Sequence, residues 1–200
     1  MEKRLPASSA AVFYLLLAGA AWAFGDLWAG LDLLTWHDRN ETSVAFDGVL
    51  GAGVGVIVVF LSAMLDRFAA WARKLSEAFA ELLGELTLSD VFVLAVTSSV
   101  AEEIFFRGFL QQLFSAQVFE TFANGDIVAL LAASVVFGAV HVGPDPKTFF
   151  PWTIMAVVMG FVLGGMYLYT GNVLAPILAH FTINFLNLSL IAQQAGKAEA

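Results

Sequence analysis

The chain has 200 residues, of which 60% are hydrophobic and only 13% are charged, and its mean hydropathy is +0.82. Soluble domains are usually under half apolar and about a quarter charged, so this composition indicates an integral membrane protein. The net charge of −8 argues against nucleic acid as a partner, since nucleic acid needs a concentrated basic surface. The absence of cysteine excludes disulfides, thiolate nucleophiles and Cys-ligated metals.

Six apolar segments follow one another along the chain, each bounded by polar or turn residues. A helix needs about 20 apolar residues to cross a bilayer, and backbone in hydrocarbon must satisfy its own hydrogen bonds, so each segment is predicted to be a helix. We expect an all-α, polytopic membrane helical bundle that forms a single domain over residues 1–200. Its spans are predicted at residues 10–34, 46–65, 88–115, 127–141, 151–170 and 173–191.

The first segment has two interpretations. Lys3 and Arg4, followed by a short apolar stretch and Ala21-Trp22-Ala23, resemble a cleavable signal peptide. The apolar character continues to residue 34, which favours a helix that is retained in the mature protein.

The segment between the second and third spans is predicted to be an amphipathic helix. Its apolar residues recur every three or four positions, with charged residues on the opposite face: Phe68, Trp71, Leu75, Phe79, Leu82 and Leu86. This pattern is typical of a helix lying in the plane of the membrane interface. The alternative is a connecting helix packed against the cytoplasmic side of the bundle.

Two apolar segments contain closely spaced glycines, a pattern that permits close contact between helices. We expect these glycines to serve packing within one chain: Gly51, Gly53 and Gly55 in the second segment, and Gly160, Gly164 and Gly165 in the fifth.

The distribution of Lys and Arg predicts that both termini lie in the cytoplasm. With the N-terminus inside, the outer loops carry only Arg39, and Arg107 lies within a span. Cytoplasmic loops are normally richer in these residues, and here the inside segments carry the rest: Lys3, Arg4, Arg67, Arg73, Lys74, Lys147 and Lys197.

The third apolar segment contains three charged residues, in the run SSVAEEIFFRGFLQQLF. A charge at membrane depth costs at least about 2–3 kcal/mol, so Glu102, Glu103 and Arg107 should face a protein-lined interior. Residues four apart share a helix face, which predicts an ion pair between Glu103 and Arg107. Glu102 lies about 100° away around the helix and remains a free carboxylate, suited to take a proton from water. The alternative is one structural salt-bridge cluster of all three.

Two other apolar segments also carry polar groups. His141 ends the fourth segment, and His180 and Asn184 share a face of the sixth at four-residue spacing. Taken singly, they could be a helix-end residue and polar links between helices. Together with Glu102 they fit peptide hydrolysis, with Glu102 as the base, His141 holding the water, and His180 and Asn184 donating to the oxyanion.

The same residue types allow a metal alternative. One Glu and two His can ligate zinc and leave an open position, which would make Glu102, His141 and His180 the ligands. The H-E-x-x-H signature and the G-x-S-x-G nucleophile motif are both absent from the sequence.

These segments resemble the three motifs of the CAAX protease and bacteriocin-processing family of intramembrane endopeptidases, also called CPBP or Abi. The likeness covers residues 88–191, the catalytic core of that family, and the motifs are EExxxR at 102–107, FxxxH at 137–141 and HxxxN at 180–184. The resemblance implies that Glu102 and His141 activate the water, and that His180 and Asn184 stabilise the oxyanion. It implies either a glutamic protease without a cofactor, which the chain favours, or a zinc metalloprotease.

We therefore predict a bacterial inner (cell) membrane endopeptidase that hydrolyses a peptide bond of a membrane-associated protein or peptide. Its partners would be membrane lipid and a substrate with a leader or C-terminal segment at the membrane. Two alternatives belong to other classes: a non-catalytic immunity or scaffold protein of the same fold, and a small proton-coupled transporter. The lack of an internal repeat counts against the transporter.

Overall fold

The computed structural model describes residues 7–36 and 42–198, with side chains described as far as residue 193. The predicted orientation depends partly on basic residues that lie outside this part of the chain, namely Lys3, Arg4, Arg39 and the side chain of Lys197. Within the described ranges the chain forms no β-strand, and an isolated bridge joins Thr35 to Asn172. The predicted all-α class is confirmed.

Seven α-helices and three π-helical segments make up the described chain. Four helical stretches are long and apolar enough to cross a membrane, namely residues 7–28, 44–68, 146–170 and 174–193, and α5 is a shorter apolar helix. The elements in chain order are α1 (Ala7–Trp22), η1 (Ala23–Trp28), α2 (Val44–Phe68), α3 (Ala70–Leu83), α4 (Leu88–Glu103), η2 (Ile104–Gln111), η3 (Phe114–Val118), α5 (Gly125–Val140), α6 (Pro146–Thr170) and α7 (Leu174–Ala198). The protein is a helical membrane bundle.

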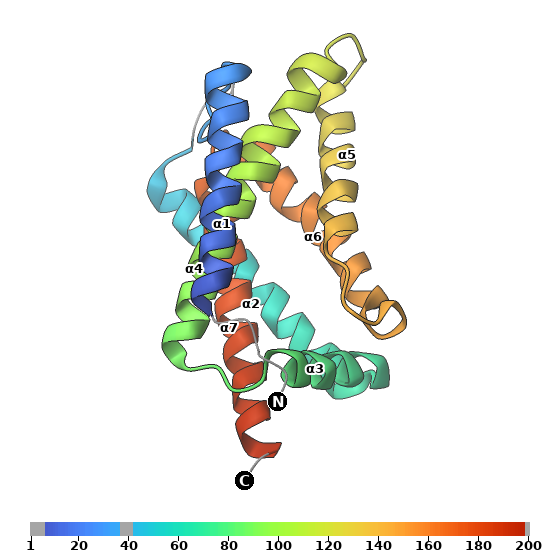
Figure 1. Ribbon diagram of the computed structural model, residues 1–200. Coiled ribbons are helices and arrows are strands. Elements are labelled where there is room, and N and C mark those ends of the chain that lie inside the picture. Colours follow the sequence, from blue (N-terminus) through green and yellow to red (C-terminus); the bar gives the residue numbers. More distant parts are fainter. Residues whose placement is uncertain (1–6, 37–41, 199–200) are drawn as a thin grey trace.

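The helices form two groups (Figure 1). In one group α7 packs against α2 and α4, and α1 packs against α4. In the other group α5 and α6 pair with each other, and they contact the first group mainly through η2, η3 and α7. The segment η2 therefore lies where the two groups meet, and it carries Arg107.

The first span ends earlier than predicted. The helix stops at Trp28, and Gly30 adopts a positive φ of 68° that breaks the helical path. Of the apolar residues beyond it, Leu31 and Leu33 are buried in the protein, with Leu33 only 2% exposed, whereas Leu34 is 45% exposed. Gln112 holds this segment in place, since its side-chain amide donates to the carbonyl oxygens of Asp32 (2.6 Å) and Thr35 (3.1 Å).

The amphipathic helix α3 lies across one end of the bundle (Figure 1). It contacts α2, α6 and α7, and it buries Leu75 while Trp71 and Leu82 stay exposed. The ring of Phe79 packs edge-on against that of Trp152 on α6, with the ring centroids 5.2 Å apart. The helix therefore packs against the bundle, and its location in the plane of the membrane interface stays a prediction.

Glycines allow α2 and α7 to approach closely. A Cβ atom added at Gly51 would lie 2.6 Å from the Ala175 carbonyl oxygen, and one at Gly55 would lie 2.6 Å from the Thr182 Cβ. Gly53 has open space around it. In the fifth predicted segment, Gly160 and Gly164 make close contacts of the same kind with α5 and η2, whereas Gly165 faces open space. Only part of each glycine cluster is therefore used for packing.

Replacing Gly51 with Ala should destabilise the protein by about 1–3 kcal/mol, because the added methyl group overlaps backbone atoms of α7. Gly53→Ala makes the same chemical change on the same helix without a nearby atom, so its melting temperature in detergent should match the wild type. Equal losses in the two variants would contradict the α2–α7 packing.

Candidate active site

Arg107 is the centre of a buried network of charges. Its guanidinium is 3.0 Å from Glu103 Oε1, and the two side chains are 2% and 0% exposed. The same guanidinium donates to the Gly160 carbonyl oxygen of α6 at 3.4 Å. Glu103 Oε1 also lies 2.7 Å from His180 Nδ1 of α7. The predicted ion pair is therefore present, with His180 as a third member that joins α4, η2 and α7.

The Phe137 ring packs in the middle of these polar groups. Arg107 Cζ lies 4.5 Å from its centroid, in a cation–π contact that helps to stabilise a buried guanidinium. The ring centroid of His141 lies 4.3 Å away and that of His180 lies 6.1 Å away. Phe137 thus separates the two imidazoles and fixes the distance between them.

His141 faces Glu102. The Nε2 atom of His141 is 3.5 Å from Glu102 Oε2, which is longer than a direct hydrogen bond. The Nδ1 atom lies 2.6 Å from the Phe137 carbonyl oxygen. A carbonyl can only accept, so Nδ1 carries a proton and the other ring nitrogen is directed at Glu102. The Thr153 hydroxyl donates to the His141 carbonyl at 2.7 Å and holds the residue where α5 ends.

Glu102 is buried but incompletely bonded. The residue is 7% exposed, and no described side chain or backbone group makes a hydrogen bond to its Oε2. A buried carboxylate oxygen without a donor is costly and therefore unusual in a folded protein. This oxygen is available to an external proton donor.

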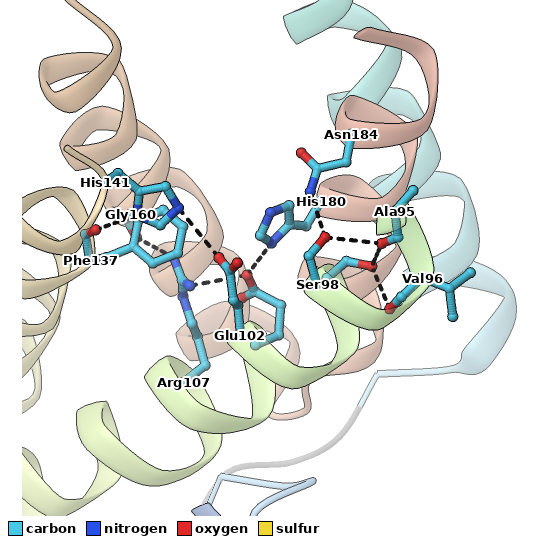
Figure 2. Close-up of polar contacts among 12 residues, drawn as sticks. Ala95, Val96, Ser98, Glu102, Arg107, Phe137, His141, Gly160, His180 and Asn184 are labelled. Carbon is cyan, nitrogen blue, oxygen red and sulfur yellow. Dashed lines mark hydrogen bonds and ion pairs between the residues drawn. The ribbon is translucent and has the colours of Figure 1, made fainter. Parts of the chain in front are cut away.

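His180 and Asn184 approach from the side of Glu102 opposite to His141 (Figure 2). The Asn184 side-chain amide donates to Ser98 Oγ at 3.0 Å. Ser98 lies one turn before Glu102 on α4, so this bond ties Asn184 to the helix that carries the free carboxylate. An amide has two N–H donors, and Ser98 uses one of them.

Comparison with known proteins places the chain in a family. The family model of the type II CAAX prenyl endopeptidase Rce1-like proteins matches residues 84–186. The chain belongs to this family. It is also 27% identical over 156 residues to YpbD of Bacillus subtilis (strain 168), a protein described as uncharacterized, and the match covers 76% of this chain and 71% of YpbD. No solved structure matches it significantly.

The match to the endopeptidase family contains every residue predicted for the active site, and α1 to α3 lie outside it. Membership supports a protease whose substrate is a peptide or protein at the membrane. Whether each of Glu102, His141, His180 and Asn184 has its predicted role stays a prediction.

The structure does not support the alternative zinc ligand set. Among the described residues, no group of three or more His, Asp or Glu side chains is arranged to hold a metal ion. His180 directs Nδ1 to Glu103, whereas Glu102 and His141 face each other. These three side chains are therefore not grouped as zinc ligands in the part of the chain that the structure describes.

Three residues that contact the site were missed in the sequence analysis: Ser98, Trp152 and Thr153, whose hydroxyl donates to the His141 carbonyl. Ser98 lies four residues before Glu102, a spacing that could have placed its hydroxyl on the same helix face. Trp152 packs against the His141 ring with the centroids 5.3 Å apart. Trp152 lies eleven residues after His141 and on another helix, so no local pattern connects the two.

The network predicts that Glu102 and Glu103 contribute unequally to the stability of the folded protein. Glu103→Gln should destabilise the protein by about 3–5 kcal/mol, because it leaves Arg107 as an uncompensated buried charge. Glu102→Gln should have a much smaller effect, since Glu102 makes no close ion pair with Arg107. Melting temperatures of the two variants in the same detergent measure the difference, and equal losses would indicate a single structural cluster of both acids.

Proposed function

We propose that the protein is an intramembrane endopeptidase in which Glu102 activates a water molecule. The observation that carries the proposal is the contrast between two adjacent carboxylates. The Oε1 atom of Glu103 is committed to Arg107 and His180. Each acid has an Oε2 without a hydrogen bond, but that of Glu102 is directed at His141. Burial holds a base at fixed geometry in a site of low dielectric constant.

The reaction begins with a water between Glu102 Oε2 and His141 Nε2. Glu102 accepts a proton from this water while the water oxygen attacks the carbonyl carbon of the scissile peptide bond. The carbonyl π electrons move to oxygen and give a tetrahedral oxyanion. When the carbon–nitrogen bond breaks, Glu102 returns the proton to the leaving nitrogen. The products are a new amine and a new carboxylic acid, which then loses its proton to the amine or to bulk water.

His180 and Asn184 are the donors that we propose for the oxyanion. The second N–H of the Asn184 amide is not used by Ser98 and is available to a substrate oxygen. When His180 carries a proton on each ring nitrogen, Nδ1 donates to Glu103 and Nε2 is left to donate to the oxyanion. Hydrogen-bond donors that are already oriented before the reaction lower the activation barrier more than donors that must reorient during it.

The setting of the reaction is also a proposal. Residues 1–200 form a single membrane-embedded domain with a catalytic core at 88–191, placed in a bacterial inner membrane with both termini in the cytoplasm. The enzyme is of the glutamic type. Its substrate is a membrane-associated peptide or protein, and the description of the family model suggests a prenylated peptide as the first probe.

Glu102→Gln tests the proposal, because it removes the base and keeps the shape of the side chain. In liposomes, cleavage of a farnesylated peptide ending in a CAAX sequence should fall by about 10²–10⁴-fold, the usual contribution of a general base. Glu81→Gln is the matched control on an exposed face of α3 and should cleave at the wild-type rate.

An unmodified peptide with a C-terminal hydrophobic tail serves as a second probe. Cleavage of this peptide alone would keep the protease assignment and replace the prenylated substrate class. Wild-type protein that cleaves neither peptide, or cleavage that persists in Glu102→Gln, would contradict the proposed function.

A further inference from the structure

Two neighbouring residues of α6 hold His141 at the end of α5. The Thr153 hydroxyl donates to the His141 carbonyl oxygen at 2.7 Å and so fixes the backbone. The Trp152 ring packs edge-on against the imidazole, with the ring centroids 5.3 Å apart and the ring planes at 72°. Residues 141–145 form no helix, so His141 lacks the support of a further helical turn, and α6 supplies contacts in its place.

The orientation of the His141 ring depends on these contacts. Its Nδ1 atom is hydrogen-bonded to the Phe137 carbonyl oxygen at 2.6 Å, whereas Nε2 lies 3.5 Å from Glu102 Oε2, beyond a direct hydrogen bond. The terminal torsion of a histidine side chain has broad preferences, so one hydrogen bond at Nδ1 does not fix where Nε2 points. Packing against the ring must do so, and Trp152 provides that packing from another helix.

Trp152 is itself packed against the amphipathic helix α3. The Phe79 ring of α3 lies 5.2 Å from the Trp152 ring at an angle of 86°. Phe79 also contacts Phe149, which is 4% exposed, with the ring centroids 5.0 Å apart. Edge-to-face pairs of this kind are favourable beyond the area that they bury. A continuous series of ring contacts therefore runs from α3 through Trp152 to His141.

We propose that Trp152 is a positioning residue that keeps the His141 imidazole turned toward Glu102. Phe79 of α3 holds Trp152 in turn. This inference rests on the proposed function, in which His141 holds the water that Glu102 deprotonates. It extends the machinery of the site to a helix that lies outside the family match at residues 84–186.

Trp152→Leu tests the inference because it removes the ring and leaves an apolar side chain. With the peptide that the wild type cleaves, kcat should fall by about 10- to 100-fold, since a displacement of about 1 Å in a catalytic group can cost that much. KM should stay at its wild-type value, because Trp152 acts on His141 and not on the substrate. Trp152→Phe restores an aromatic ring and should keep most of the wild-type kcat.

Trp36→Leu is the matched control. Trp36 is 8% exposed and packs edge-on against Tyr167, with the ring centroids 5.2 Å apart, in a separate cluster of buried residues. This variant should lower the melting temperature at least as much as Trp152→Leu and leave the kcat of the folded protein unchanged. Equal losses of kcat in the two variants would contradict the inference. A raised KM with unchanged kcat in Trp152→Leu would also overturn it, because Trp152 would then contact the substrate.

Phe79→Leu tests the link to α3. Its kcat should fall by about 2- to 10-fold, the range that one aromatic pair contributes. Because Phe79 acts through Trp152, the double variant should be no slower than Trp152→Leu alone. Losses that multiply in the double variant would contradict the proposed series of contacts.

Nuclear magnetic resonance of protein labelled with ¹⁵N-histidine gives a readout that does not require cleavage. The chain has three histidines, and the His141 signal is the one lost in His141→Gln. Its Nδ1–H signal should shift and broaden in Trp152→Leu but not in Trp36→Leu, because the ring loses its fixed orientation. An unchanged signal, or an unchanged kcat, in Trp152→Leu would overturn the inference. If Glu102→Gln cleaves like the wild type, the proposed function fails separately, and this signal still decides whether Trp152 holds the His141 ring.

Discussion

The buried ion pair of Arg107 and Glu103 is the interaction on which the arrangement of the bundle depends. A guanidinium that is 2% exposed cannot remain unpaired, because an uncompensated buried charge costs several kcal/mol. Arg107 is therefore surrounded by groups from other elements: the Phe137 ring of α5, the Gly160 carbonyl of α6 and, through Glu103, the His180 imidazole of α7. Satisfying one charge brings together the helices that carry the candidate catalytic residues.

This network also separates the roles of two chemically identical neighbours. Successive residues on a helix point about 100° apart, so Glu102 and Glu103 cannot share the same surroundings. Glu103 is 0% exposed and is bonded to Arg107 and His180, whereas Glu102 faces His141 at 3.5 Å. Most of the electrostatic stabilisation is thus provided by one acid, and the other is left available for proton transfer.

Local spacing predicts part of this site well. The Glu103–Arg107 pair follows from four-residue spacing on one helix, and the helical segments follow from hydropathy. The contact of His180 with Glu103 could not be predicted, because spacing along one helix says nothing about the helix that packs against it.

Hydropathy failed at the end of the first span for a different reason. Leu31 and Leu33 are as apolar as residues in a membrane helix, yet they are buried against η2 and other protein segments. Burial in protein and burial in lipid require the same side chains, so composition cannot distinguish them. The close packing of this segment against η2 is visible at Gly108. A Cβ atom there would lie 2.1 Å from the Leu33 carbonyl oxygen.

The central claim is that a carboxylate, and not a metal ion, activates the water. The most direct measurement determines metal content and peptide cleavage on the same purified sample, before and after exhaustive chelation. We expect full cleavage activity after chelation and no stoichiometric zinc, since Glu102 and His141 supply the proton acceptor and the orientation of the water. A catalytic zinc would provide the activated water itself, so loss of cleavage on chelation and its recovery when zinc is returned would contradict this account.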